Sequence, residues 1–292
     1  MEKKENFIGK AGVWVDSLWE DALSRWSVRS GQDKNYRWHV VHPAIVSILS
    51  TGHRGNDLRI LDLGCGDGII LDDLKNRELF SDKGLYLGID MSQKLIEKAR
   101  DSHSWGNAVF LQGNLSDSNL AGKIIERGAG WDCVLSVFVI QEIPDCESFI
   151  ENLSKVVEPD SLVVIITVHP DFAEWLKQNG GMKAAEDITS RSEPENPPWR
   201  WAGSYPIVDE PHDVFYLPYF HRTIEDYRSL FARFGMIIDT VLELPDKHNE
   251  LPFLVEEGIS PFTPFENNVY WPYIGEEPSA LAIIARKETA FG

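Results

Sequence analysis

The chain of 292 residues contains little cysteine, little positive charge and no long apolar run. Its three cysteines, Cys65, Cys133 and Cys146, show no C-x-x-C or Cys/His ligand spacing, which indicates a reducing compartment without disulfides or structural zinc. The longest apolar runs, such as residues 162–168, are too short to span a bilayer. The N-terminal residues lack the apolar segment of a secretory signal. These absences predict a cytoplasmic protein that does not cross a membrane.

Positive charge is scarce, because 28 Lys and Arg residues stand against 46 Asp and Glu residues and give a formal net charge of −18. A nucleic acid would meet a repulsive field at such a surface, and no basic run offers it a local site. The simplest interpretation of the excess acid is solubility. Nucleic acid is therefore not the expected partner, and a small molecule is.

Short apolar runs of β-strand character alternate with helical stretches over the central part of the chain. The runs occupy residues 58–63, 84–90, 108–113, 131–137 and 161–168. Continuous apolar strands separated by helices are typical of a parallel sheet that helices cover on both faces. We therefore predict an α/β fold with a Rossmann-like doubly wound sheet, mostly parallel with an antiparallel last strand.

The rest of the chain departs from this alternation. Apolar residues at helical spacing near the start predict N-terminal helices, and Thr223 begins a helix-capping signature in the C-terminal part. Two segments rich in proline and aromatic residues interrupt the second half. The sequence thus divides into an N-terminal helical cap (1–54), a Rossmann-like core (55–169), an aromatic substrate lid (170–213) and the C-terminal part of the core (214–292) with a second insert (245–277).

The sequence ILDLGCGDG at residues 60–68 ends the first predicted strand with alternating glycines. Gly64, Gly66 and Gly68 allow a sharp turn and let a ligand lie against bare backbone, at the strand ends where open α/β sheets bind ligands. A dinucleotide fingerprint would need its third glycine at the position of Ile69, and the G-K-[ST] of a P-loop is absent. A nicotinamide enzyme and a tight turn without a ligand remain as alternatives.

Residues 60–68 resemble motif I of the class I S-adenosylmethionine-dependent methyltransferases over its full length. In that family an acid at the end of the second strand accepts hydrogen bonds from both ribose hydroxyls, and Asp90 stands at this place. The resemblance covers residues 55–168 and implies S-adenosyl-L-methionine as cofactor and S-adenosyl-L-homocysteine as product. The cofactor-binding residues that it implies are Tyr36, Asp62, Gly64, Cys65, Gly66, Gly68, Asp90, Met91, Asn114, Leu115, Val137 and Gln141.

Some of these assignments leave alternatives. Asn114 stands where the family often has an acid that binds the adenine amino group, and Asp117 lies close enough in sequence to take that role. Residues 131–145 resemble motif IV, but Gln141 and Glu142 occupy the position where His is common. We interpret Asp62 either as a ligand or as a brace for the loop, and Cys65 as a small packing residue.

Rings and histidines outside the strand–helix repeat supply the candidates for acceptor binding and catalysis. Aromatic side chains in a polar segment can line a pocket or stack on a flat substrate. The substrate candidates are Trp199, Trp201, Tyr205, Tyr216 and Tyr219. The catalytic candidates are His221, His169 and Glu142, because His suits proton transfer near neutral pH. The alternative for the rings is ordinary packing, and for the histidines a structural hydrogen bond. No His/Asp/Glu cluster has metal spacing, so no metal is expected.

The resemblance implies methyl transfer to a small molecule, with a hydroxyl group in specialised metabolism as one acceptor. Much of the rate of such a reaction comes from aligning the acceptor with the methyl group and excluding water. A general base is needed only where the acceptor must lose a proton. A cofactor-binding protein of the same fold, with another reaction or a regulatory role, is the alternative, and a protein- or RNA-modifying methyltransferase is the third reading. A homodimer is compatible with the sequence.

Overall fold

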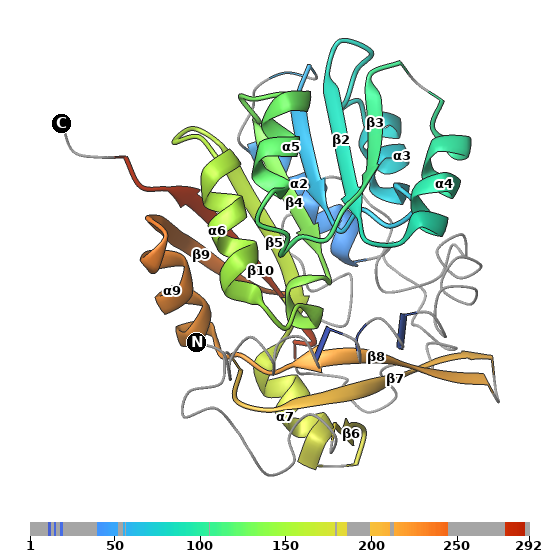
Figure 1. Ribbon diagram of the computed structural model, residues 1–292, viewed down its shortest axis with the longest axis vertical. Helices are drawn as coiled ribbons and strands as arrows, with labels where there is room; N and C mark the ends of the chain where they lie inside the picture. The colour runs from blue at the N-terminus through green and yellow to red at the C-terminus, as the bar shows by residue number, and fades with distance from the viewer. Residues whose placement is uncertain are drawn as a thin grey trace.

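The computed structural model describes most of the predicted core. The residues described are 11, 12, 15, 18, 19, 40–51, 55, 57–104, 106–178, 180–185, 199–210, 213–244 and 278–289. Tyr36 and the second predicted insert, 245–277, lie outside them, as do the side chains of residues 205–210 and 213–215. The chain forms a large sheet with helices on both faces and a small second sheet at one end (Figure 1).

Seven strands form the large sheet in the order β3-β2-β1-β4-β5-β10-β9. All of its pairs are parallel except those of β10, which runs antiparallel to both β5 and β9. The doubly wound sheet with an antiparallel last strand is thus confirmed, and the first five strands lie within two residues of their predicted bounds. The strands are β1 (Arg59–Leu63), β2 (Leu85–Asp90), β3 (Ala108–Gln112), β4 (Cys133–Val137), β5 (Leu162–Val168), β9 (Met236–Leu244) and β10 (Ala280–Lys287).

Successive side chains of each strand point to opposite faces of the sheet, where they are buried against helices. Ile60 belongs to a core with α2, α3 and α4, whereas Leu61 belongs to a second core with α5, α6 and α9 (Figure 1). The helices are α2 (His42–Thr51), α3 (Ile69–Asn76), α4 (Gln93–Ser102), α5 (Leu120–Arg127), α6 (Cys146–Val156), α7 (Pro170–Gln178) and α9 (Ile224–Arg233), with a short 3-10 helix η2 (Ile140–Glu142).

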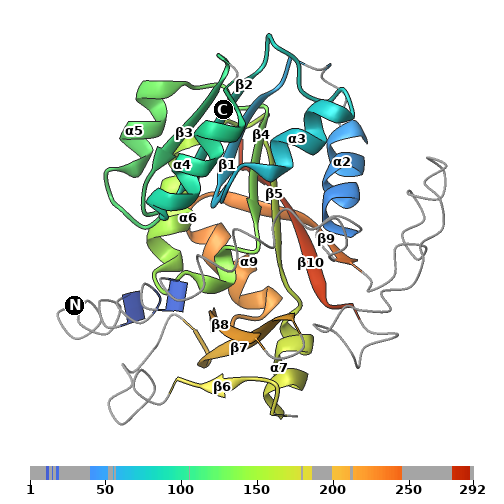
Figure 2. The same cartoon turned by 90° about the vertical axis from the view of Figure 1, so that its right-hand side faces the viewer.

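The small sheet, which we call the cap sheet, consists of β6 (Lys183–Ala184), β7 (Ala202–Glu210) and β8 (Asp213–Phe220). It is antiparallel, and Figure 2 shows it beyond the end of β5 from which α7 departs. The division that the sequence suggested between residues 213 and 214 passes through the β7–β8 hairpin, because β-ladder pairing extends the insert to Phe220.

The described residues between 11 and 19 pack against the cap sheet, whereas α2 packs against the large sheet. Ala11, Val15 and Trp19 recur every four residues, so they share one helical face, and they join a cluster with Trp199 and Phe220. These N-terminal residues and the cap sheet therefore form one structure, which we call the cap, over the carboxyl edge of the large sheet.

The predicted helix signature at Thr223 is confirmed as a capping box. The Thr223 side chain accepts a hydrogen bond from the Asp226 N–H, and the Asp226 carboxylate accepts one from the Thr223 N–H. This reciprocal pair satisfies backbone donors that the first helical turn leaves free. It fixes the chain where β8 leaves the cap and α9 joins the core.

Candidate active site at the carboxyl edge of the sheet

The glycine loop between β1 and α3 folds back onto the end of β2. The N–H groups of Gly64 and Cys65 both donate to the carbonyl of Ile89, at 2.7 and 3.0 Å. Gly64, Gly66 and Gly68 all have positive φ angles, of 86°, 57° and 78°. Side chains of L-residues clash with the backbone in that region, so glycine is the residue that the turn requires.

The glycines also differ in the space beside them. A Cβ atom on Gly64 would overlap the side chain of Val139, which follows β4 and packs directly on the loop. A Cβ atom on Gly66 would meet no atom within 4 Å. Gly64 is therefore needed for packing inside the protein, whereas Gly66 leaves bare backbone beside open space that a ligand can fill.

Asp90 ties this loop to the end of β2. One carboxylate oxygen accepts the Gly66 N–H at 2.9 Å, and the other accepts the Ser92 N–H at 2.8 Å. Each oxygen retains a further lone pair, so the carboxylate can still accept from a vicinal diol. The neighbouring Met91 is 40% exposed, so its side chain is accessible to a flat ring.

A buried pair lies beneath the loop. Asp62, at the end of β1, accepts a hydrogen bond of 2.5 Å from the Tyr86 hydroxyl. Burial, and then the charge of Asp62, raises the pKa of Tyr86 well above its ordinary value, so the phenol stays protonated and donates. Burial also raises the pKa of Cys65, with the charge of Asp62 adding to it. Cys65 is thus a neutral thiol, which agrees with a packing role.

On the outer side of the loop, Asp67 is held by Lys98 of α4 at 2.7 Å. This pair neutralises one of the three acids near the glycine turn, namely Asp62, Asp67 and Asp90. Lys98 could not be identified from the sequence, because it belongs to no recognisable motif.

The two candidates for binding the adenine amino group, Asn114 and Asp117, have different surroundings in the structure. The exposed Asn114 side chain accepts a hydrogen bond from Ser116 N–H at 2.9 Å. The Asp117 carboxylate instead holds the start of α5, because it accepts from the Asn119 N–H at 3.0 Å and pairs with Lys123 at 3.0 Å. These bonds, the first above all, lower the pKa of Asp117. Asn114 is therefore the candidate with an amide group still facing solvent.

The turn after β4 carries several candidates on a strained backbone. Phe138 has a φ angle of 57°, which is rare for a bulky residue and typical of functional sites. Gln141 is fully buried, and its carbonyl oxygen accepts from the Thr167 hydroxyl at 3.1 Å, while its Nε2 has no hydrogen-bond partner among the described residues. Glu142 accepts from the indole N–H of Trp19 at 3.1 Å. The N-terminal segment therefore contacts this turn directly.

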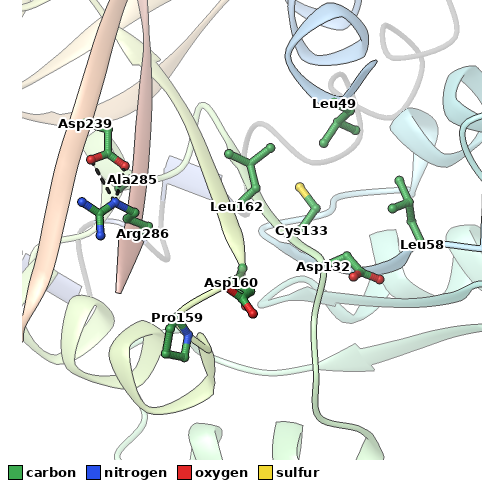
Figure 3. Close-up of a pocket in the computed structure, with 11 residues that line it drawn as sticks. Leu49, Leu58, Asp132, Cys133, Pro159, Asp160, Leu162, Asp239, Ala285 and Arg286 are labelled. Atoms are coloured by element: carbon green, nitrogen blue, oxygen red, sulfur yellow. Dashed lines mark hydrogen bonds and ion pairs between the residues drawn. The ribbon is translucent and has the colours of Figure 1, made fainter. Parts of the chain in front are cut away.

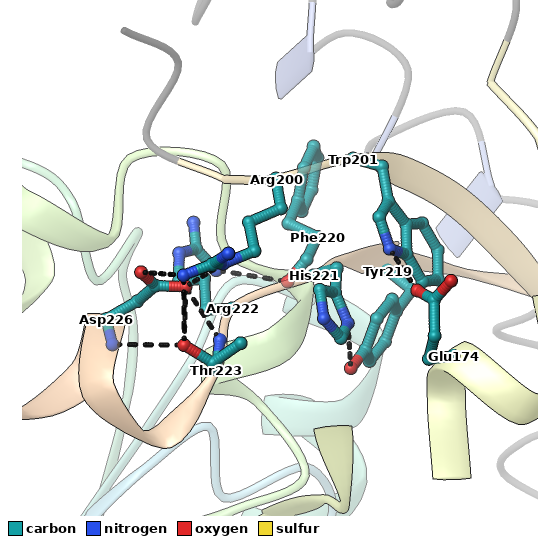
Figure 4. A network of polar contacts seen from close by, with 9 residues as sticks. All are labelled: Glu174, Arg200, Trp201, Tyr219, Phe220, His221, Arg222, Thr223 and Asp226. Carbon is teal, nitrogen blue, oxygen red and sulfur yellow. Dashed lines mark hydrogen bonds and ion pairs between the residues drawn. The ribbon is translucent and has the colours of Figure 1, made fainter. Parts of the chain in front are cut away.

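His221 lies at the end of β8, inside a polar and aromatic cluster of the cap (Figure 4). Its ring stacks on Trp201 with the ring centroids 4.8 Å apart, and its Nδ1 lies 3.4 Å from the Tyr219 hydroxyl. Trp201 donates its indole N–H to Glu174 at 2.8 Å. Burial lowers the pKa of His221, and the positive charge of Lys177 acts in the same direction, against the charge of Glu174. The ring is therefore neutral near pH 7.

The remaining candidates for substrate binding and catalysis contact other residues of the protein. Trp199 is 4% exposed and packs on Phe220 with 4.6 Å between the ring centroids, so its ring belongs to the cap's own core. Tyr216 is covered by the ammonium group of Lys183 at 3.6 Å. His169 accepts from the Asp171 N–H at 3.1 Å at the start of α7. The side chain of the candidate at position 205 lies outside the described residues.

A hollow of about 310 Å³ lies elsewhere, at the amino ends of the strands (Figure 3). Cys133 and Leu162, which begin β4 and β5, line it together with the ion pair of Asp239 and Arg286. Ligands of open α/β sheets bind at the opposite edge. This hollow is therefore not the candidate active site.

Three further findings concern metals, membrane helices and disulfides. Among the described residues, no group of three or more His, Cys, Asp or Glu side chains could hold a metal ion. None of the helices in the described part of the chain is long and apolar enough to cross a membrane. The three cysteines are buried and form no disulfide.

A family model described as a methyltransferase domain matches residues 55–231, more than half of the chain. The match includes the glycine loop, Asp90, the turn after β4 and the cap sheet. The chain belongs to this methyltransferase family. The resemblance seen at residues 60–68 is thus confirmed, and S-adenosylmethionine is the cofactor of the class. The residues fit it, because Gly66 borders open space, Asp90 can accept from a diol and Met91 is exposed.

Curated relatives of this methyltransferase include two ubiquinone biosynthesis O-methyltransferases. The one from Bartonella bacilliformis is 25% identical over 118 residues, which cover 40% of this chain and 44% of the relative. The one from Vibrio atlanticus is 25% identical over 158 residues, which cover 54% of this chain and 62% of the relative. The chain thus spans about half the length of the curated relatives it matches.

Solved structures show the same fold. An S-adenosylmethionine-dependent methyltransferase from Mesorhizobium loti superposes with a TM-score of 0.51 at 16% identity, covering 87% of this chain and 99% of that one. Magnesium protoporphyrin IX methyltransferase from Synechocystis PCC 6803, with bound S-adenosylhomocysteine, gives a TM-score of 0.55 at 15% identity, covering 95% of this chain and 99% of that one. At such identities the likeness concerns the fold alone.

Proposed function

We propose that this methyltransferase transfers the methyl group of S-adenosylmethionine to a hydroxyl group of a small molecule. The observation that carries the proposal is the cap, which reaches the turn after β4 through the hydrogen bond between Trp19 and Glu142. A site covered in this way excludes water and suits a small acceptor better than a macromolecule. The names of the relatives describe oxygen methylation, which supports a hydroxyl acceptor.

The protein's part in this reaction is binding, alignment and proton transfer. When bound, the cofactor supplies an electrophilic methyl group. Asp90 would hold the ribose hydroxyls, Met91 would lie against the adenine and Asn114 would accept from its amino group. These contacts would fix the direction in which the methyl group faces the cap. Holding the acceptor oxygen in line with it accounts for much of the rate in this proposal.

His221 is the proposed general base. A hydroxyl acceptor loses its proton as the new bond forms, and a neutral imidazole can take it. Burial holds the pKa of His221 below its ordinary value of about 6.5, so the base is unprotonated at pH 7. Stacking on Trp201 and the nearby Tyr219 hydroxyl restrict how the ring can turn.

The test is the variant His221→Ala, measured in single-turnover reactions with an acceptor found by screening small hydroxyl compounds with labelled cofactor. We expect turnover to fall by about 10²- to 10⁴-fold, the usual contribution of a general base. In the unaltered protein, turnover should decline as the pH drops through the lowered pKa of His221 and stay level above it, because only the neutral ring accepts a proton.

Affinity for S-adenosylhomocysteine, measured by calorimetry, is the control and should change by no more than a few-fold. Normal turnover in a folded His221→Ala variant would remove His221 from the chemistry. Tight cofactor binding without transfer to any acceptor would instead favour a protein that binds the cofactor for another reaction or for regulation.

A further inference from the structure

Arg222 follows His221 and is almost fully buried, with 2% of its surface exposed. Its guanidinium donates to the carbonyl of Ile143 at 2.8 Å and to those of Ile140 and Pro144 at 3.3 Å each. A longer contact of 3.5 Å reaches the carbonyl of Phe220 in the cap sheet. Arginine can bind several carbonyls at once because its planar guanidinium presents five N–H donors in a rigid arrangement.

The carbonyls that Arg222 binds belong to the turn that carries Gln141 and Glu142. That turn has few bonds of its own, because η2 is a single 3-10 turn of three residues. The Glu142 N–H donates to Val139 at 2.8 Å, but the Ile143 N–H reaches Ile140 only at 3.4 Å. The guanidinium therefore supplies hydrogen bonds that the turn cannot make internally.

The backbone beside Arg222 is itself fixed. The next residue, Thr223, begins the capping box of α9, and Asp226 of that box is also held by Arg200 at 2.7 Å (Figure 4). On its other side, the His221 N–H donates to the Trp201 carbonyl at 2.8 Å. Arg222 thus extends from the hydrogen-bonded junction of cap and core to the turn at the end of β4.

We infer that Arg222 is a positioning residue that sets the place of Gln141 and Glu142 relative to the cap. It acts through the carbonyls of the turn. A cap that shifts or loosens would therefore move the turn with it. The inference rests on the proposed function only for its effect on transfer, and its effect on the turn is independent of that function.

The experiment compares Arg222→Met, Arg222→Lys and a matched control, Arg228→Met. Arg228 also donates to a backbone carbonyl, that of Ile238 at 3.2 Å, but on the side of α9 next to β9. Amide hydrogen exchange of the peptide that spans residues 138–145 is measured in the full chain. We expect exchange there to quicken by about tenfold or more in Arg222→Met, by less in Arg222→Lys, and to stay unchanged in Arg228→Met.

Two further measurements distinguish positioning from general loss of structure. Affinity for S-adenosylhomocysteine should stay within a few-fold, since the glycine loop and Asp90 lie outside the turn. Once an acceptor is known, its kcat should fall more than its KM rises, with partial recovery in Arg222→Lys.

Unchanged exchange of residues 138–145 in a folded Arg222→Met protein would overturn the inference. So would faster exchange of the turn with unaltered transfer, because the turn would then not govern placement. If Arg222→Met does not fold, Arg222→Lys decides by the same two readouts. Faster exchange in a chain that transfers no methyl group at all would uphold the link to the turn and contradict the proposed function instead.

Discussion

Asp90 has two tasks in the same site, since it fastens the glycine loop and faces the place of the ribose. We predict that Asp90→Ala weakens the binding of S-adenosylhomocysteine by about 1.5–3 kcal/mol, the scale of hydrogen bonds to a charged group. Calorimetry measures the affinity, and the melting temperature reports on the loop bonds from Gly66 and Ser92. Asp239→Ala, at the exposed pair with Arg286, is the control and should bind normally. An unchanged dissociation constant in a folded Asp90→Ala variant would move the ribose elsewhere.

Motif residues could be predicted from the sequence, but their partners could not. Asp62 and Asp90 stand at fixed places relative to the glycines, so their approach to the loop follows from local chain geometry. The bond from Tyr86 to Asp62 depends on the register of β1 with β2. This register pairs Ile60 with Tyr86, so that Asp62, two residues further along β1, lies diagonally from Tyr86 on the same face of the sheet. One signal was available, because a buried tyrosine hydroxyl needs a hydrogen-bond partner.

At the scale of elements, the glycine loop offers a matched pair of substitutions. Gly64→Ala places a methyl group against Val139 at a positive φ angle, so we expect loss of both stability and cofactor affinity. Gly66→Ala meets no protein atom and carries only the cost of its φ angle, about 1–2 kcal/mol. Its melting temperature should fall modestly, while its affinity for S-adenosylhomocysteine falls sharply. Equal affinity in Gly66→Ala and the unaltered protein would mean that no ligand approaches this backbone.

The alternation of strands and helices between residues 58 and 168 was predictable because each strand is a local apolar run with a local turn after it. The cap was harder. Proline and aromatic residues marked it as a separate segment, yet they did not reveal that β7 pairs with β8 across the suggested boundary. They also left open whether the rings line a pocket or pack in a core, and Trp199 packs on Phe220. Pairing and packing between distant segments decide both points, and composition does not encode them.

For the whole molecule, the position of β10 makes the large sheet depend on a late segment of the chain. A protein ending at residue 277 lacks β10, which separates β5 from β9 and pairs with both. We predict that it loses cooperative thermal unfolding and aggregates, because the apolar edge of β5 is left open. A protein that lacks only residues 290–292 is the control and should melt like the full chain. Calorimetry and light scattering measure the two effects, and a sharp transition in the shorter protein would contradict the prediction.

The same strand order has a consequence for synthesis on the ribosome. β1 to β5 can pair with one another as they emerge, and only the far edge of β5 waits for a strand made later. β9 emerges after the cap sheet and α9 but has no neighbour in the large sheet until β10 follows it, and Ala280 must then pair with Val168, far back in the chain. Such distant pairing is slow compared with local contacts. The nascent chain therefore carries an incomplete sheet with β5 as an open edge until β10 has left the ribosome, and that interval is when a chaperone would have most to protect.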